Sequence, residues 1–433
     1  MFRVGKGKMA QAAEVRFTED QLRALDVLHK PGNVFITGEA GSGKSFVIRH
    51  FHRSLNAKTF PILASTGAAA VLVGGRTFHS FMGLGIMEGG VDATVRRAVS
   101  DRRVVSRLKK AEGIIIDEVS MISGPALRAA EHICRIARSH EDLPWGGLKV
   151  VAVGDFAQLP PVEADRQGKS WAFLDPVWEQ SDFSTVVLRQ NMRTQDHNFL
   201  SVLNTVRKGE VDSDVETYLN SRIYSIEDGE FHGTRLFPLR RQTEEFNDRQ
   251  LAQLEGDLHT FTAQYVGKDR SIAQLKKCSP LPEFLRLKLG ALVMLRHNDP
   301  RQRWVNGSTG WVRSISENSI RVELASGREV DVEPITLTQM NAEGQVQAAV
   351  TQMPLNLAYA ATIHKAQGLT LDSALINLDA LWEPGQAYVA LSRVIQGGRL
   401  CIQKWSPGSI KSDPQVMDFY RHLEAQLEDT SLL

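Results

Sequence analysis

The chain has 433 residues, of which 42% are hydrophobic and 23% are charged. Such a chain can bury a large core and is expected to form roughly two to four domains. The 51 Lys and Arg residues almost balance the 50 Asp and Glu residues, so any surface for nucleic acid has to be a local basic patch.

The cysteine content and the hydropathy exclude several classes of protein. Cys134, Cys278 and Cys401 are far apart in the sequence, which argues against a zinc site or a disulfide framework and favours a reducing compartment. No apolar run approaches the ~18 residues that a membrane span needs. Residues 1–16 lack the apolar core of a secretory signal and are predicted to be a flexible leader, with a targeting role left open.

Apolar, strand-like runs alternate with helical patterns from residue 17 to about residue 190. The runs are residues 34–37, 62–65, 113–116, 149–153 and 185–188. This alternation predicts a mostly parallel sheet with helices on both faces, and therefore an α/β fold.

Residues 38–45 satisfy the G-x-x-x-x-G-K-[ST] pattern of a phosphate loop, between a predicted strand and a predicted helix. Backbone N–H groups of such a loop point at phosphates, Lys44 is placed to reach the β and γ phosphates of ATP, and the Ser45 hydroxyl can bind Mg²⁺. The candidate nucleotide-binding residues are Gly38, Ala40, Gly41, Ser42, Gly43, Lys44 and Ser45.

Gln21 has two interpretations. The segment Thr18-Glu19-Asp20-Gln21 fits a capping box, in which Gln21 only satisfies the backbone at the start of a helix. The Gln21 amide can also recognise adenine. The residues alone do not separate these roles, and both can hold.

Two carboxylates follow the buried run 113–116, where ligands bind in open α/β sheets. We expect Asp117 to hold Mg²⁺ and Glu118 to orient and deprotonate the attacking water. The alternative is an ordinary acidic pair at a strand end. The run 149–153 leads in the same way to Gln158, which is placed to sense the γ-phosphate; the alternative there is an exposed turn before a proline pair.

Phosphoryl transfer needs cations beside the developing charge. Arg193 follows the strand-like run 185–188, at the predicted start of a second α/β domain, and Arg393 lies on a predicted helix of that domain. Taken singly, each is more often a salt-bridged surface arginine than a catalytic one.

The sequence texture changes between residues 308 and 333 to short runs of period two, which predict antiparallel hairpins. We therefore expect a small β-barrel-like insert at residues 298–353. Strand and helix patterns resume at 374–378 and 400–402. After Asp413, apolar residues at helical spacing predict a docked amphipathic helix.

These segments resemble the superfamily-one class B DNA helicases, especially the petite-integration-frequency (PIF) branch, with RecD-like enzymes as near relatives. The resemblance runs from about residue 17 to residue 405. The segments that carry it are residues 17–21, 38–45, 64–85, 114–121, 154–162, 190–193, 361–372 and 388–394. A helical pattern at 123–138, with Leu127, Ile133 and Ile136, is similar to the signature helix of the branch.

The resemblance implies two RecA-like P-loop NTPase domains with ATP between them and single-stranded DNA across their tops. It places domain 1A at 17–184 with a wedge insertion 1B at about 77–92, domain 2A at 185–297 and 354–433, and an SH3-like domain 2B at 298–353.

The resemblance also implies roles for single residues. Arg193 and Arg393 would be arginine fingers supplied within the chain, and Gln367 and Gly368 would link DNA contacts to the γ-phosphate. Phe78 or His79 would stack on bases, although His79 by itself is typical of a structural histidine. The implied DNA contacts are Thr66, Gly67, Phe78, His79, Ser80, Thr362, His364 and Lys365.

We therefore expect an ATP- and Mg²⁺-dependent 5′–3′ DNA helicase that acts on forked duplexes and G-quadruplexes, with functions in replication, recombination and repair. Its expected partners are single-stranded DNA, junctions with duplex, and single-stranded DNA-binding or repair proteins. It would be a monomer, with self-association on DNA left open. It would lie at the nucleoid in a bacterial or phage system and in the nucleus or mitochondrion of a eukaryote.

Two other functions remain. One is a DNA-stimulated translocase that remodels protein–DNA complexes without separating strands, and the other is an ATP-gated switch or adaptor. The polarity follows from the resemblance alone.

Overall fold

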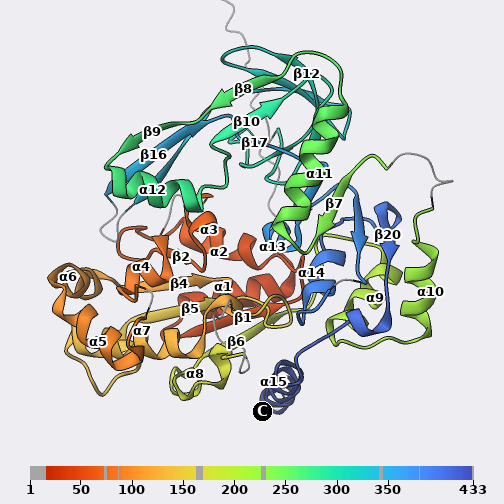
Figure 1. Ribbon diagram of the computed structural model, residues 1–433. Helices are drawn as coiled ribbons and strands as arrows, with labels where there is room; N and C mark the ends of the chain where they lie inside the picture. The colour runs from red at the N-terminus through yellow and green to blue at the C-terminus, as the bar shows by residue number, and fades with distance from the viewer. Residues whose placement is uncertain are drawn as a thin grey trace, which may run out of the picture.

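The computed structural model describes residues 16–72, 76–85, 87–161, 169–225, 231–301, 303–340, 345–379 and 381–431. Figure 1 shows two α/β units side by side, with a β-rich part above them. The predicted leader, residues 1–16, lies outside the described residues except for Arg16.

The first unit is built on a six-stranded sheet with the strand order β3-β2-β4-β5-β1-β6, in which every pair of neighbours is parallel. This sheet confirms the predicted α/β architecture. Its strands are β1 (Val34–Gly38), β2 (Ile62–Ala64), β3 (Arg76–Thr77), β4 (Gly113–Asp117), β5 (Lys149–Val153) and β6 (Ser184–Leu188).

Helices cover both faces of this sheet, because the side chains of each central strand alternate between two cores. In β1, Val34 and Ile36 face the core under α1 (Glu19–His29) and α2 (Lys44–His52), whereas Phe35 faces the opposite core. The helices of that opposite face are α4 (Phe78–Met82), α5 (Gly90–Ser100), α6 (Arg102–Lys110), α7 (Gly124–Arg138) and α8 (Pro176–Gln180). The short α3 (Gly67–Leu72) follows β2.

The predicted signature helix is α7. Leu127 and Ile133 are fully buried, as expected, whereas Ile136 is exposed.

The second unit has a four-stranded parallel sheet in the order β18-β7-β19-β20. Its strands are β7 (Thr234–Phe237), β18 (Ala360–Thr362), β19 (Ala374–Asn377) and β20 (Leu400–Lys404), and its helices are α9 (His197–Arg207), α10 (Ser213–Ser221), α11 (Arg240–Gln253), α13 (Ile363–Ala366) and α14 (Gln386–Leu391). Strand β6 pairs with β1 of the first sheet. The predicted domain boundary between residues 184 and 185 is therefore wrong, because it assigns most of β6 to the second domain. Arg193 accordingly follows an edge strand of the first unit and not a strand of the second.

The β-rich part contains the predicted hairpins. Its main sheet is antiparallel, with the order β14-β13-β12-β11-β17, and two smaller sheets, β15-β16-β9 and β10-β8, lie beside it. The elements are β8 (His259–Thr262), β9 (Gln264–Gly267), α12 (Asp269–Cys278), β10 (Phe284–Leu287), β11 (Leu292–Leu295), β12 (Thr309–Ile315), β13 (Ile320–Leu324), β14 (Glu329–Val332), β15 (Ile335–Met340), β16 (Val346–Gln352) and β17 (Leu355–Leu357).

The predicted range 298–353 is too short for this sheet. It omits β11 and β17, and Leu285 and Leu287 of β10 belong to the same core as Val293 of β11. The rest of the domain division stays a prediction.

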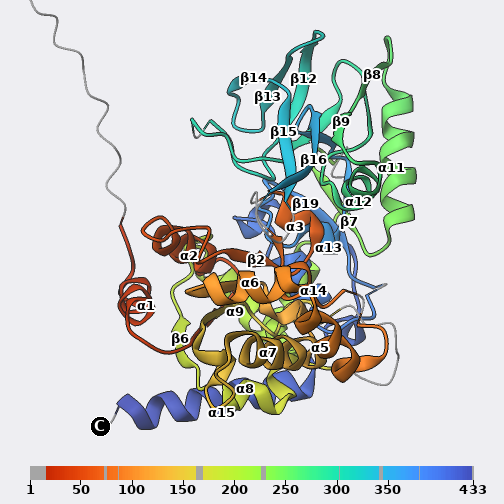
Figure 2. The ribbon, with the colours of Figure 1, turned by 90° about the vertical axis from the view of Figure 1, so that its left-hand side faces the viewer.

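The last helix, α15 (Pro414–Ser431), confirms the predicted amphipathic tail. It packs against the first unit, although the prediction places residues 354–433 in domain 2A. Val416, Tyr420 and Leu423 are buried in the core of the first unit, although the chain enters α15 from the second. Figure 2 shows α15 running along the lower edge of the first unit, below α7. None of the described helices is long and apolar enough to cross a membrane.

Candidate active site

The loop between β1 and α2 has the backbone geometry of a phosphate cradle. Gly38, Gly41 and Gly43 have φ angles of 147°, 92° and 89°, a region that side chains other than glycine rarely adopt. A Cβ at Gly41 would lie 2.7 Å from the Cβ of Arg193. Glycine is therefore needed both for the curl of the loop and for the close approach of Arg193.

Lys44 lies over this loop. Its Nζ donates to the carbonyl oxygens of Gly38 at 2.7 Å and Glu39 at 3.0 Å. Burial lowers the pKa of Lys44, an effect opposed by the carboxylates of Asp155 and Glu118. The loop thus presents an ammonium group and backbone amides to a phosphate.

The two predicted carboxylates stand at the end of β4. Burial raises the pKa of Asp117, whose Oδ1 accepts a hydrogen bond from the Glu118 backbone N at 3.1 Å. Burial, and then the neighbouring charge of Asp117, raise the pKa of Glu118 to about 7. A carboxylate with such a pKa is suited to take a proton from water near neutral pH.

A cavity of about 540 Å³ lies beside these groups and is lined by residues of both units. From the first unit and the segment after β6 it receives Lys44, Ser45, Glu118, Gln158 and Arg193, and from the second unit Gly368 and Arg393. The other lining residues are Ala40, Gly41, Gly43, Phe46, Arg49, Met192, Thr370 and Ile395. The predicted residues Gln21, Gly38, Ser42 and Asp117 are not in the lining.

The predicted arginines approach the cavity from two sides. Arg193 donates from Nη1 to the carbonyl oxygen of Ser392 at 2.5 Å. Arg393 is almost fully buried and donates to the Val389 carbonyl oxygen and the Ser392 hydroxyl, each at 2.8 Å. Burial, and then the charge of Arg193, lower the pKa of Arg393 to about 9. Two cations are therefore held close together beside the cavity.

Gln21 has the predicted capping role and a second contact as well. Thr18 and Gln21 form both hydrogen bonds of a capping box. The Gln21 side chain also donates from Nε2 to the Ser42 carbonyl oxygen at 3.2 Å. The helix cap is therefore joined to the phosphate loop, whereas adenine recognition stays a prediction.

Two polar residues that the sequence analysis left without a role hold the same loop. Asn191 donates from Nδ2 to the Ala40 carbonyl oxygen at 2.9 Å, and its Oδ1 accepts from the backbone N of Arg193 at 2.9 Å. The Tyr388 hydroxyl accepts from the Ala40 backbone N at 2.8 Å. Both residues lie in motifs that carried the family resemblance, but their spacing alone does not indicate these contacts.

The donor set fits a nucleotide and its magnesium ion. Ser42 Oγ is buried with no hydrogen-bond partner in the described part of the chain. Ser45 and Asp117 offer one hydroxyl and one carboxylate. Mg²⁺ usually takes only one or two carboxylates, with phosphate oxygens and waters completing its shell. No group of three or more His, Cys, Asp or Glu that could hold a metal occurs among the described residues.

Threonine hydroxyls begin the helices that carry the predicted DNA contacts. Thr66 Oγ1 accepts from the Ala69 backbone N, and Thr362 Oγ1 accepts from the Lys365 backbone N, both at 3.2 Å. Each hydroxyl thus caps a helix, although Thr362 is buried, and contact of either hydroxyl with DNA stays a prediction. Gly67 is the first residue of α3.

Phe78 corrects the sequence prediction. Its side chain is fully buried in the first core, so it cannot stack on a base. His79, the other candidate, is only half-buried, and Ser80 is exposed. Burial lowers the pKa of His79. Of the two stacking candidates only His79 has an accessible ring, and its contact with a base stays a prediction.

The predicted contacts of the second unit lie on α13. His364 and Lys365 are exposed. His364 Nε2 is 3.7 Å from a carboxylate oxygen of Glu383, which also pairs with Lys169 of the first unit at 2.6 Å. Partial desolvation, then the charges of Arg240 and Arg296, lower the pKa of Lys365. Arg296, at the end of β11, is a buried cation that the sequence analysis missed.

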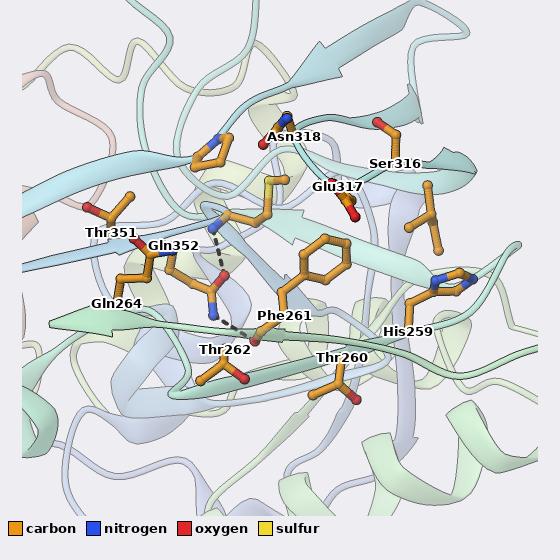
Figure 3. Close-up of a pocket in the computed structure, with 13 residues that line it drawn as sticks. His259, Thr260, Phe261, Thr262, Gln264, Ser316, Glu317, Asn318, Thr351 and Gln352 are labelled. Carbon is orange, nitrogen blue, oxygen red and sulfur yellow. Dashed lines mark hydrogen bonds between the residues drawn. The ribbon is translucent and has the colours of Figure 1, made fainter.

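A second cavity, of about 550 Å³, lies in the β-rich part, away from all the predicted site residues. Figure 3 shows Gln264, Thr351 and Gln352 on one side of it and Ser316, Glu317 and Asn318 on another. Gln352 is already engaged, since its Nε2 donates to the Phe261 carbonyl oxygen at 3.0 Å. No Lys or Arg occurs among the described residues that line this cavity, so it does not suit a nucleotide.

Comparisons with known proteins agree with this geometry. The sequence profile described as PIF1-like helicase matches residues 16–217. The ATP-dependent DNA helicase Pif1 of Bdellovibrio bacteriovorus is 52% identical over 425 residues, which cover 98% of this chain and 96% of that protein.

Solved structures match as well. The structure of Bacteroides sp Pif1 in complex with ADP-AlF4 has a TM-score of 0.84 at 28% identity, and that of Bacteroides Pif1 bound to ssDNA has a TM-score of 0.65 at 28% identity; each match covers 95% of this chain and 98% of the other. The predicted RecA-like fold and the predicted family are thereby confirmed. The chain belongs to the PIF1-like helicase family.

Proposed function

We propose that this protein is an ATP-dependent DNA helicase that moves 5′ to 3′ along single-stranded DNA and opens duplex ahead of it, including forked and G-quadruplex substrates. One observation carries the proposal. A single cavity takes the phosphate loop and Glu118 from the first unit, and Gly368 and Arg393 from the second. Nucleotide bound there touches both units, so its hydrolysis changes how they are held together.

Each of these residues has a separate proposed role in ATP hydrolysis. The loop amides and Lys44 bind the phosphates, and Ser45 and Asp117 hold Mg²⁺, which supplies positive charge to the β and γ phosphates. Glu118 accepts the proton of the attacking water, and Gln158 orients that water. Arg193 and Arg393 stabilise the charge that develops on the transferred group.

Coupling to DNA runs through the segment that follows α13. The Gln367 side chain donates from Nε2 to Oε2 of Glu118 at 3.4 Å. His364 and Lys365, proposed to contact DNA, lie three and two residues before Gln367 in the sequence. A DNA-induced shift of α13 would therefore move a group that touches the proposed catalytic base.

The proposed partners are single-stranded DNA and its junctions with duplex, and the contacts are electrostatic and stacking contacts that do not read sequence. A structure of Bacteroides Pif1 bound to ssDNA supports this choice of ligand. We propose that one chain suffices for hydrolysis, because both candidate arginine fingers come from the chain that carries the phosphate loop.

Unwinding of matched tailed duplexes tests the proposal. The same duplex is given either a 5′ or a 3′ single-stranded tail, with ATP and Mg²⁺, and Lys44→Ala serves as the blank. Opening of the 5′-tailed duplex alone is the expected result. Opening of only the 3′-tailed duplex would overturn the polarity.

A variant with a shorter loop between α4 and α5, within the predicted wedge insertion, distinguishes a helicase from a translocase. Shortening this loop should abolish strand opening while ATP hydrolysis stimulated by single-stranded DNA persists. If the intact protein hydrolyses ATP in response to DNA but opens neither substrate, it is a translocase. If DNA does not change the hydrolysis rate at all, both proposals fail.

A further inference from the structure

Helix α15 joins the two units. The chain leaves the second unit after β20, and α15 then packs against the first. The ring of Phe419 stacks on that of Phe173 with centroids 4.5 Å apart, and Figure 2 shows the helix lying along the first unit. A helix that only filled a hydrophobic surface would need nothing more than such apolar contacts.

The Tyr420 hydroxyl makes three buried hydrogen bonds. It donates to Oδ1 of Asp155 at 3.0 Å and accepts from the backbone N of Phe156 at 2.9 Å. Because its one proton is directed at Asp155, the Thr37 hydroxyl donates to it, at 3.0 Å. Thr37 immediately precedes the phosphate loop, so one hydroxyl from α15 holds the ends of both β1 and β5.

Asp155 connects this hydroxyl to the second unit. Its fully buried carboxylate accepts from Nη2 of Arg207 at 2.8 Å. Although burial disfavours the charged form, the guanidinium of Arg207 keeps the pKa of Asp155 below its usual value. Arg207 ends α9, whose apolar face belongs to the core of the second unit, and its guanidinium lies 4.4 Å from the centre of the Tyr420 ring.

Asp155 also begins the turn that presents Gln158 to the cavity. The Ala157 backbone N donates to Oδ1 of Asp155, and the Gln158 backbone N donates to the Asp155 carbonyl oxygen, each at 3.1 Å. The second unit approaches this turn at Gly385, where a Cβ would lie 2.3 Å from the Gln158 carbonyl oxygen. The position of the Gln158 side chain thus depends on the carboxylate that Tyr420 and Arg207 share.

We propose that Tyr420 is a positioning residue for ATP recognition. By fixing Asp155 and Phe156, it holds the turn so that the Gln158 amide faces the γ-phosphate. Because Arg207 lies on α9 and pairs with Asp155, a movement of the second unit also shifts this turn. ADP lacks the γ-phosphate, so the contact contributes only to the binding of ATP. This inference rests on the role proposed above for Gln158.

Nucleotide affinity measured with the full chain and Mg²⁺ tests the inference. The variants are Tyr420→Phe, Arg207→Lys and Gln158→Ala, and the probes are ADP and a non-hydrolysable ATP analogue, the β,γ-imido triphosphate. Tyr420→Phe and Arg207→Lys should each weaken binding of the analogue about tenfold, as loss of about one hydrogen bond predicts, and change ADP binding less than about twofold. Tyr265→Phe is the matched control, because the buried Tyr265 hydroxyl has no hydrogen-bond partner within the described residues.

The outcomes separate the inference from the function on which it rests. If Gln158→Ala selectively weakens binding of the analogue but Tyr420→Phe and Arg207→Lys do not, the inference alone is wrong. If Tyr420→Phe weakens both nucleotides equally, the hydroxyl only stabilises the fold, and the inference is also overturned. If Gln158→Ala has no selective effect, the role of Gln158 fails and the inference fails with it. A Tyr420→Phe protein too unstable to assay leaves Arg207→Lys to decide between these results.

Discussion

Gln367 and Glu118 form a direct hydrogen bond between the two α/β units, with Nε2 of the glutamine 3.4 Å from Oε2 of the glutamate. The carboxylate comes from the end of β4, and the amide comes from the segment after α13. The proposed base is therefore in contact with the strand–helix segment that carries the proposed DNA contacts of the second unit. This contact provides a short path by which DNA binding alters hydrolysis.

Gln367→Ala should uncouple hydrolysis from DNA. The substitution removes the amide but leaves Glu118, Lys44 and the phosphate loop in place, so ATP hydrolysis without DNA should change by less than about threefold. Stimulation by single-stranded DNA should fall by about tenfold, the effect expected when one hydrogen bond is lost. Steady-state ATPase rates with and without an oligonucleotide measure both quantities.

A matched control for Gln367 is Gln253→Ala, at an exposed position of α11, which should leave both rates unchanged. If Gln367→Ala keeps its full response to DNA, the proposed coupling path is wrong. Loss of the DNA-free rate as well would assign Gln367 to hydrolysis itself.

The pH dependence of ATP hydrolysis should follow the protonation of the Glu118 carboxylate. Because burial and Asp117 raise its pKa to about 7, the carboxylate becomes protonated as the pH falls through 7, and a protonated carboxyl cannot accept the proton of water. The kcat/KM for ATP should therefore be half-maximal near pH 7 and fall about tenfold per pH unit at lower pH.

Protonation of Glu118 does not destabilise the fold, so unfolding caused by this group cannot explain the loss of activity at low pH. The folded-state pKa of Glu118 lies above the ordinary value of 4.5, so the folded protein binds this proton more tightly than the unfolded chain does. Lowering the pH from 7 towards 4.5 thus favours folding at this position. Glu118→Gln should abolish hydrolysis at every pH while nucleotide binding remains, and an unchanged acidic limb at a low residual rate would assign the titration to another group.

Substitution of the two candidate arginine fingers should affect the chemical step more than binding. Arg193→Lys and Arg393→Lys should each lower kcat by about a hundredfold or more, because a lysine cannot reproduce the planar donor set beside the transferred phosphoryl group. Arg241→Lys is the control, since Arg241 pairs with Glu245 on the exposed face of α11. A rise in KM with kcat unchanged would show that these arginines bind nucleotide without stabilising the transition state.

Phe78 and His79 are adjacent in the sequence and should behave in opposite ways. Phe78→Ala should lower the free energy of unfolding by about 3–5 kcal/mol, because it empties a fully buried ring position. His79→Ala should leave the unfolding free energy almost unchanged and weaken binding of single-stranded DNA by about 1–3 kcal/mol. Chemical denaturation and fluorescence anisotropy measure the two effects. Unaltered DNA affinity of His79→Ala would remove His79 from the DNA path.

Lys365 should contribute to DNA affinity through a phosphate. Lys365→Ala should weaken binding of single-stranded DNA and reduce the slope of log affinity against log salt concentration by about 0.7, the value for one phosphate contact on a single strand. Titrations at several salt concentrations measure the slope. An equal loss of affinity at all salt concentrations would show that Lys365 acts by packing and not by charge.

Much of the site could be predicted from the sequence, because its parts are local. A glycine-rich loop between a strand and a helix presents its amides in only one way, and Asp117 and Glu118 have to emerge together at the end of the strand that carries them. In the structure Val34 and Ile36 share one core and Phe35 faces the other, as the alternation of side chains along any strand requires.

Only the tertiary structure decided the matters that depend on residues far apart in the chain. It placed β6 in the first sheet, buried Phe78, and brought α15 back to the first unit, where Tyr420 meets Asp155. Local spacing cannot determine these outcomes, because the free energy of burying an apolar strand or helix face is much the same against any complementary surface. Which surface is available follows from the path of the whole chain.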